Sequence, residues 1–126
     1  MWIIQTSPIQ WTQVTASGAF IPRQAGVLLY FKQTLFIMGG WGGGNDNQWY
    51  SSSDLGKTWN VRGMTTWGYS GGLIRLATGV VTETSMYFMG GYWLQGSKYY
   101  YNAVYRSDGT SWMLICTAAP WTARSN

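Results

Sequence analysis

Short apolar stretches alternate along the chain with clusters of glycine, asparagine, aspartate and serine, at a spacing of roughly ten residues. Such alternation is typical of consecutive short antiparallel strands joined by turns. In the first half of the chain it predicts four strands, at Ala25–Phe31, Leu35–Gly39, Gln48–Ser52 and Thr58–Val61. In the second half it predicts four more, at Gly72–Ala77, Met86–Gly90, Ala103–Ser107 and Trp112–Ile115. The chain is therefore expected to be all-β.

The strand pattern repeats. Residues 34–40 (TLFIMGG) recur 51 positions later as residues 85–91 (SMYFMGG), and a tryptophan punctuates each unit at Trp11, Trp59 and Trp112. Self-similarity at a period near 50 residues indicates stacked supersecondary units. Four strands in about 50 residues correspond to one blade of a β-propeller. We therefore predict a β-propeller segment of two four-stranded antiparallel blades with overhanging strands.

The two ends of the chain carry related spacings. Trp11, Phe20 and Arg23 are spaced like Trp112, Trp121 and Arg124, displaced by 101 residues or two repeats. We expect one partial propeller over 1–126, divided into an overhang with the last strand of a preceding blade (1–20), blade one (21–62), blade two (63–116) and a linker to a next blade (117–126). Because such repeats bury their core only between neighbours, we expect further blades of a longer chain or a homo-oligomer.

Several of these elements together resemble kelch repeats. They are the Gly-Gly after an apolar strand, the aromatic residues Trp49 and Tyr105, the closing tryptophan, and the Pro-Arg and Pro-Trp-x-Ala-Arg linkers. The similarity is to the Trp-rich kelch repeats grouped with the galactose-oxidase central domain, and it covers nearly the whole chain. The second unit departs from it at Gly68–Gly71, where neither Pro nor Arg stands. The resemblance implies a fold rather than a function, because propellers bind many unrelated partners.

A second resemblance lies within the first. Residues 52–59 (SSDLGKTW) are similar to the Asp-box of sialidase-like propellers, Ser-x-Asp-x-Gly-x-Thr-Trp, and residues 107–112 (SDGTSW) are a shortened version. In such a turn, aspartate accepts backbone N–H bonds and glycine takes a positive φ. We expect structural roles in turns and blade closure, with both tryptophans buried, for Asp54, Gly56, Trp59, Asp108, Gly109 and Trp112.

Composition narrows the chemistry. The chain has no histidine, the commonest general base and metal ligand, so Ser-His, Cys-His and copper sites like that of galactose oxidase are excluded within it. Gly39–Gly44 lacks the Lys-Ser/Thr of a phosphate-binding loop. A sialidase site would need more blades than two. We therefore expect no catalytic residue, no metal site and no cofactor in this chain.

Charge and hydropathy exclude further classes of partner. Only 10% of the residues are charged, and the net charge of +4 is scattered without a basic cluster, so nucleic-acid binding is not expected. The single cysteine, Cys116, excludes an internal disulfide. No segment approaches the ~20 apolar residues of a membrane span.

What remains is binding by aromatic loops. The loops Trp41–Asn47 and Tyr92–Asn102 each follow the second strand of a unit and should leave the same end of a propeller. The second loop is five residues longer, and added loop length is typical of binding. Their candidate partner-binding or glycan-binding residues are Trp41, Tyr92, Trp93, Tyr99, Tyr100 and Tyr101. The leading hypothesis is a non-catalytic interaction or scaffold module that presents these loops to a protein partner or a larger assembly. The alternatives are a glycan-binding propeller, a non-catalytic part of a larger propeller enzyme and, for the aromatic residues themselves, packing between blades.

Overall fold

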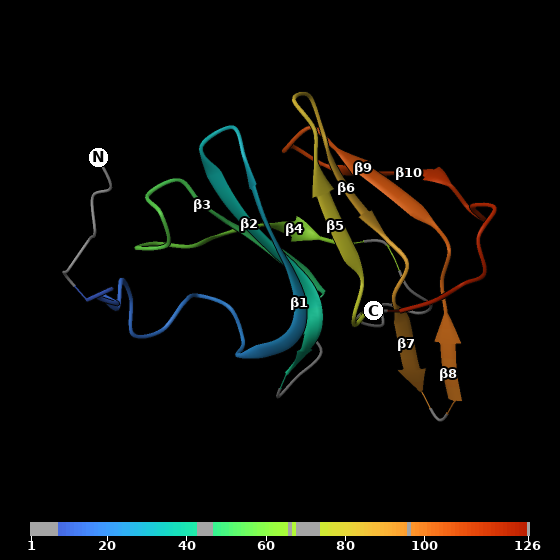
Figure 1. Ribbon diagram of the computed structural model, residues 1–126, viewed down its shortest axis with the longest axis horizontal. Helices are drawn as coiled ribbons and strands as arrows, with labels where there is room; N and C mark the ends of the chain where they lie inside the picture. Colours follow the sequence, from blue (N-terminus) through green and yellow to red (C-terminus); the bar gives the residue numbers. More distant parts are fainter. Residues whose placement is uncertain (1–7, 43–46, 66, 68–73, 96, 126) are drawn as a thin grey trace, which may run out of the picture.

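The computed structural model describes residues 8–42, 47–65, 67, 74–95 and 97–125, and shows two four-stranded antiparallel sheets and a two-stranded hairpin (Figure 1). Sheet one has the order β1 (Arg23–Phe31), β2 (Thr34–Gly42), β3 (Gln48–Ser52) and β4 (Asn60–Met64). Sheet two has the order β5 (Thr78–Val81), β6 (Met86–Met89), β9 (Val104–Ser107) and β10 (Trp112–Cys116). The hairpin pairs β7 (Tyr92–Gln95) with β8 (Ser97–Tyr100). The all-β prediction is confirmed.

Most strand predictions agree with the structure, but the first strand of the second unit was predicted wrongly. It was expected at Gly72–Ala77, whereas β5 covers Thr78–Val81, and the described residues 74–77 contribute only an isolated bridge between Arg75 and Tyr92. A tight turn sets the observed register, because the Thr82 N–H donates to the Ser85 carbonyl at 2.8 Å and pairs Val81 with Met86. The fourth strand of sheet one likewise starts at Asn60 rather than at Thr58.

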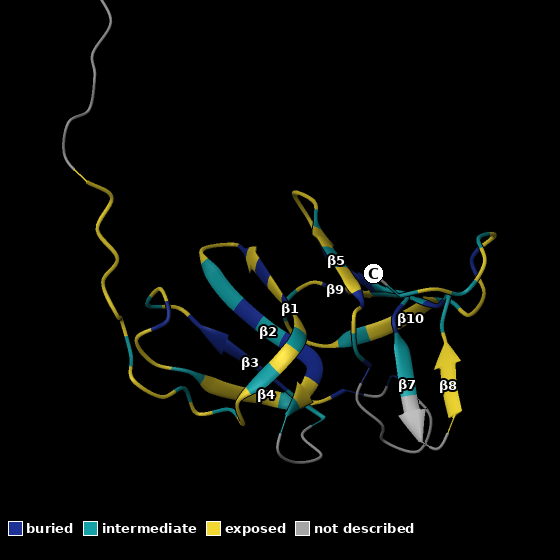
Figure 2. Cartoon of the chain, turned by 60° about the horizontal axis from the view of Figure 1, so that its bottom comes forward, coloured by how far each residue is buried: buried dark blue, intermediate teal, exposed yellow. Residues whose placement is uncertain are grey.

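The two sheets pack face to face around one apolar core. Side chains alternate along β1, so that Val27, Leu29 and Phe31 are buried while Leu28 and Tyr30 are exposed. In sheet two, Gly79 lies against Val27 and Leu29, where an added Cβ atom would lie 2.8 Å from Leu29 Cδ2. The core continues outwards through Phe36, Met38, Trp49, Trp67, Ile74, Ala77, Met86 and Phe88. Figure 2 shows the alternation as bands of buried and exposed positions along β1.

The repeated Gly-Gly pairs have nearly the same backbone geometry. Gly39 and Gly40 have φ values of 64° and 85°, and Gly90 and Gly91 have values of 68° and 87°. The Gly40 N–H donates to the Ile74 carbonyl at 2.9 Å, and the Gly91 N–H donates to the Arg124 carbonyl at 2.7 Å. Each pair therefore anchors the segment that follows its own unit, and the sequence repeat corresponds to a repeat of structure.

The segments before β1 and after β10 form no strands and pack against the sheets. Residues 8–22 contain no strand, and Trp11 is 94% exposed, so the strand expected in 1–20 has no counterpart in the described residues 8–20. Phe20 covers the outer face of sheet one, 5.6 Å from the Tyr50 ring and 5.2 Å from Trp59. At the other terminus, the Asn102 amide donates to the carbonyls of Ala119 and Trp121, at 2.9 and 3.1 Å.

The β3–β4 turn is organised around the Asp54 carboxylate. Ser52 Oγ donates to Asp54 Oδ1 at 2.8 Å, and Thr58 donates to the same carboxylate from its N–H at 2.9 Å and from its hydroxyl at 2.6 Å. Gly56 has a φ of 92°, and its carbonyl accepts the Trp59 indole N–H at 3.1 Å. In the shorter β9–β10 turn, the Thr110 N–H donates to Asp108 Oδ1 at 3.0 Å and the Gly109 N–H donates to Ser107 Oγ at 3.0 Å.

The closing tryptophans differ from the expectation of full burial. Trp59 and Trp112 are both half-buried. Trp59 lies on the outer face of sheet one, where Phe20 covers it edge-on. Trp112 belongs to β10, an edge strand of sheet two, and contacts Trp49 and Trp67 by ring edges at 6.0 and 4.9 Å. The centre of the core is instead occupied by Trp49 and Trp67, at 2% and 1% exposure.

The Asp54 turn predicts a pH-dependent stability. Hydrogen bonds from the Thr58 side chain, the Thr58 N–H and Ser52 lower the pKa of Asp54 to about 2. Because an unfolded aspartate has a pKa of about 3.9, the ionised carboxylate stabilises the fold above that pH, and this contribution is lost as the pH falls towards 2. We expect Asp54→Asn to lower the melting temperature at pH 7, with the difference from the wild type shrinking as the pH falls from 5 to 2.

The matched control for this experiment is Glu83→Gln, at an exposed carboxylate in the β5–β6 turn. Thermal unfolding followed by circular dichroism across that pH range measures both variants. A constant difference between Asp54→Asn and the wild type at every pH would contradict the role of the carboxylate charge.

Candidate binding surface

The longer of the two predicted binding loops is a β-hairpin rather than an irregular loop. Its strands, β7 and β8, pair Tyr92 with Tyr100 and Trp93 with Tyr99, and the hairpin projects beyond the end of sheet two (Figure 1). The prediction of a loop over Tyr92–Asn102 is corrected accordingly. The physical reason lies in the sequence SKYY, since tyrosines opposite Tyr92 and Trp93 form favourable cross-strand aromatic pairs. We call residues 92–100 the aromatic hairpin.

The aromatic hairpin divides its rings between two faces, because neighbouring side chains on a strand point in opposite directions. Trp93 and Tyr99 form one pair, with ring centroids 5.6 Å apart and planes at 34°. Tyr92 and Tyr100 form the other pair, 5.8 Å apart, and the Lys98 ammonium lies 5.3 Å from the centre of the Tyr92 ring. Tyr99 and Tyr100 are 53% and 47% exposed, so both faces present aromatic surface to solvent.

Trp41 lies near the base of the aromatic hairpin and is 45% exposed. The Arg75 guanidinium stacks over the Trp41 ring at 4.9 Å, while the Arg75 backbone exchanges hydrogen bonds with Tyr92 at 2.9 and 3.0 Å. One arginine thus connects the candidate residues that follow β2 and β6. Residues 43–46 of the first loop lie outside the described residues. Sequence reasoning treated Arg75 only as a scattered charge and missed this connection.

Tyr101 has a different environment from the other candidates. It is half-buried and packs against the core. Its N–H donates to the Gly91 carbonyl at 2.9 Å, and its carbonyl accepts the Arg124 N–H at 3.1 Å. These bonds hold the residue after β8 and the segment near the C-terminus against the end of sheet two. The other five candidates do not pack against the core, and we call them the aromatic surface: Trp41, Tyr92, Trp93, Tyr99 and Tyr100.

The described carboxylates lie at one end of the sheets only, whereas cationic residues lie at both ends, since Lys32 and Lys57 belong to the β1–β2 and β3–β4 turns beside the carboxylates. Four cationic residues lie at the end where β2 and β6 finish, which we call the hairpin end: Arg23, Arg75, Lys98 and Arg124. The described carboxylates, Asp54, Glu83 and Asp108, all lie in turns at the opposite end. Asp46 lies outside the described residues. The hairpin end therefore combines aromatic rings with positive charge.

Two observations bear on other classes of site. In the part of the chain that the structure describes, no group of three or more His, Cys, Asp and Glu side chains is arranged to hold a metal ion. Within the same residues there is no helix with the length and apolar character needed to cross a membrane.

Comparison with known proteins gives a structural match alone. No protein-family model and no curated protein sequence matches the chain. The solved structure of YjhT superimposes with a TM-score of 0.68 at 19% sequence identity. The match covers 90% of this chain but only 32% of the YjhT chain, so this chain spans about a third of the length of that protein. At this identity the similarity concerns the fold.

Proposed function

We propose that the chain is a non-catalytic interaction module, built from two kelch-type propeller blades, that binds a protein partner through the aromatic surface at its hairpin end. The observation that carries the proposal is the aromatic hairpin itself. It extends beyond the sheets, holds two cross-strand aromatic pairs, and has no counterpart in the described part of the first unit.

Three further observations support the propeller interpretation. The Gly-Gly pairs repeat in φ and in their hydrogen bonds, and both four-stranded sheets begin with the strand that contacts the other sheet. The matched region of YjhT is about a third of that chain. If two sheets fill about a third of such a structure, about six would complete it, which lies within the usual range of four to eight blades.

The composition of the hairpin end favours a protein partner with an acidic surface. Tyrosine, tryptophan and arginine are the residues most enriched in binding hot spots. Here Trp41 carries a stacked arginine and Tyr92 a stacked lysine, so each ring is held in place by a cation. Electrostatic complementarity increases association rates with partners of opposite charge and is weakened by salt.

Glycan binding is the second candidate. The exposed rings of Tyr99 and Tyr100 are of the kind that stacks on sugars. The charged residues described at the hairpin end are cationic, which suits an acidic protein surface better than an uncharged glycan. The third hypothesis is an enzyme whose active site lies in blades outside this chain. The five rings of the aromatic surface do not support it.

The experiment compares the double variant Trp93→Ala/Tyr99→Ala with the wild type. Loss of two hot-spot aromatics at about 2 kcal/mol each, about 4 kcal/mol together, should weaken partner binding roughly a thousandfold. The melting temperature should change by no more than about 3 °C, because the pair lies outside the core. Immobilised wild-type chain captures proteins from its source cells, which are identified by mass spectrometry, and the same samples are applied to a glycan array.

Met113→Ala is the matched control, since Met113 is 59% exposed on the outer strand β10 and Tyr99 is 53% exposed. The proposal is supported by a protein that the wild type and the control retain, that the double variant loses, and that high salt releases. If the wild type and the control bind only glycans, and the double variant does not, glycan binding is the function of the aromatic hairpin. Equal binding by all three chains in both assays would overturn the role of the hairpin.

A further inference from the structure

Each sheet buries one face in the contact between the sheets and leaves the opposite face of β1 or β5 exposed, beside the part of sheet one that Phe20 covers. In sheet one, Val27 and Leu29 point towards sheet two, so Leu28 and Tyr30 point away and are 60% and 53% exposed. In sheet two, Gly79 points towards sheet one, so Val80 points away and is 47% exposed. The two open faces therefore lie on opposite sides of the molecule.

The repeat relates these open faces to the contact that is already formed. Through the 51-residue offset, Leu28 of sheet one corresponds to Gly79 of sheet two, on the face that meets sheet one. Likewise, Leu29 corresponds to Val80, on the open face of sheet two. The open face of sheet one thus corresponds to the face of sheet two that meets sheet one. The open face of sheet two corresponds to the face of sheet one that meets sheet two. The two open faces are therefore of the same two kinds that meet in the formed contact.

Side-chain sizes at these positions are complementary. In the formed contact, the large residues Val27 and Leu29 meet Gly79, which leaves no room for a side chain. In the further contact, the corresponding residues of sheet two are the smaller Thr78 and Val80, and they would meet the larger Leu28. The exchange of large and small residues keeps the summed volume similar, as close packing requires.

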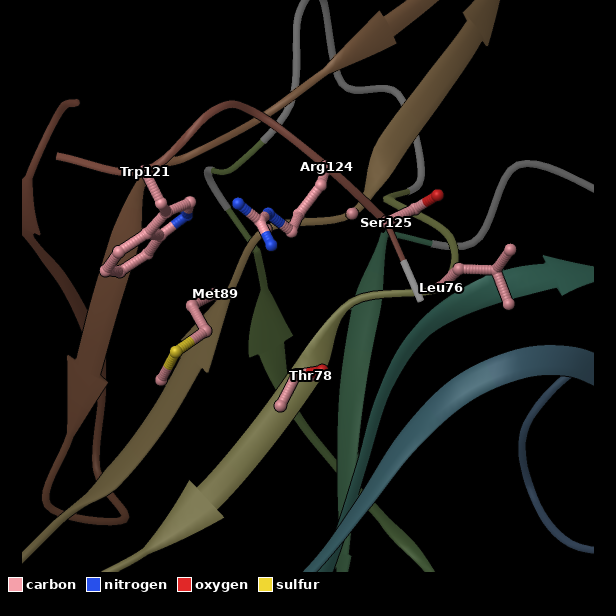
Figure 3. A pocket seen from close by; sticks show the side chains of 8 residues that line it. Leu76, Thr78, Met89, Trp121, Arg124 and Ser125 are labelled. Atoms are coloured by element: carbon pink, nitrogen blue, oxygen red, sulfur yellow. The ribbon is translucent and has the colours of Figure 1, made fainter. Parts of the chain in front are cut away.

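A hollow of about 360 Å³ opens on sheet two, between Thr78 and Met89 of the sheet and residues Trp121, Arg124 and Ser125 of the C-terminal segment (Figure 3). Its lining includes Thr78 and Met89, whose counterparts Val27 and Met38 are 7% and 0% exposed beneath sheet two. In the formed contact the Phe88 ring lies against Gly39, about 3.4 Å from where its Cβ would be. The counterpart of Phe88 is Ile37, which would enter the hollow from a second molecule.

We propose that the open face of sheet two binds the open face of sheet one in a second copy of this chain, with Leu28, Tyr30 and Ile37 of that copy covering Thr78, Val80 and the hollow. The contact is head-to-tail, because it joins two different faces, and repeated contacts of this kind close into a ring when the rotation allows. About three copies would supply the six sheets inferred from the YjhT match. This association is independent of what the aromatic surface binds.

The first test measures the mass of the 126-residue chain by light scattering, alone and with either face blocked. We expect about three times the 14.1 kDa of one chain for the wild type, and 14.1 kDa for both Leu28→Lys and Val80→Lys. Controls of matched exposure on the outer strand, Met113→Lys at 59% and Ile115→Lys at 46%, should keep the wild-type mass. Circular dichroism verifies folding, and Tyr30→Lys blocks the same face if Leu28→Lys does not fold.

The second test mixes the two blocked variants. Leu28→Lys keeps an intact face on sheet two and Val80→Lys keeps an intact face on sheet one, so the mixture should form a dimer containing one of each and nothing larger. A folded wild-type monomer would overturn the proposal. The open face of sheet two would then be one that a further sheet of a longer polypeptide covers. Loss of assembly in only one variant, or no dimer in the mixture, would overturn the head-to-tail arrangement.

Discussion

Replacing Trp67 by alanine is expected to lower the free energy of unfolding by roughly 3–5 kcal/mol, the range for a large aromatic removed from a core. Trp67 is 1% exposed, and its indole stacks on Phe88 with centroids 4.3 Å apart and planes at 5°. It also meets Tyr105 and Trp112 by ring edges, at 5.2 and 4.9 Å. Because an ordinary domain is stable by only about 5–15 kcal/mol, this loss should leave much of the chain unfolded.

Urea unfolding followed by tryptophan fluorescence and circular dichroism measures the effect. Trp67→Phe is the first control, since phenylalanine keeps a ring against Phe88 and should restore part of the lost stability. Trp59→Ala is the second control, and it should cost less because Trp59 is half-buried and covered mainly by Phe20. A Trp59→Ala variant less stable than Trp67→Ala would show that the core is not centred on Trp67.

The repeat explains why most of the fold could be predicted from the sequence. Residues 34–40 and 85–91 become β2 and β6 with the same Gly-Gly geometry. The same 51-residue offset applied to Ala25–Phe31 would have predicted a strand near residues 76–82, which contains β5. The prediction of Gly72–Ala77 followed local apolar content instead. Strand pairing with β6 determines the register, and local hydrophobicity carries little information about pairing.

Other features depend on contacts between distant residues and could not be predicted in the same way. Trp67 belongs to no strand, and its burial follows from the stacking of sheet two on sheet one. The aromatic hairpin was read as an added loop, although the opposed residues Trp93 and Tyr99 form a cross-strand pair. The role of Arg75 arises from its position between Trp41 and Tyr92, which are 51 residues apart in the chain.

Gly40→Ala is expected to destabilise the fold by roughly 2–5 kcal/mol, for two reasons that add. The φ of Gly40 is 85°, in the left-handed region that costs an alanine about 1–2 kcal/mol. In addition, a Cβ atom there would lie 2.6 Å from the Gln24 carbonyl oxygen and 2.8 Å from the Gly26 nitrogen. Both neighbours are backbone atoms of β1, which cannot rotate away, so overpacking adds about 1–3 kcal/mol.

Gly56→Ala separates the two contributions. Gly56 has a similar φ of 92°, but the nearest atom to its added Cβ is the Trp59 ring at 3.9 Å, an ordinary contact distance. It should therefore lose only the backbone term of about 1–2 kcal/mol. Urea unfolding of both variants measures the difference, which isolates the close approach of β1 to the end of β2. Since the Gly40 N–H also holds Ile74 at the start of the second unit, we expect Gly40→Ala to loosen the contact between the sheets as well. Equal losses at Gly40 and Gly56 would contradict the close approach and leave the repeated Gly-Gly with a purely conformational role.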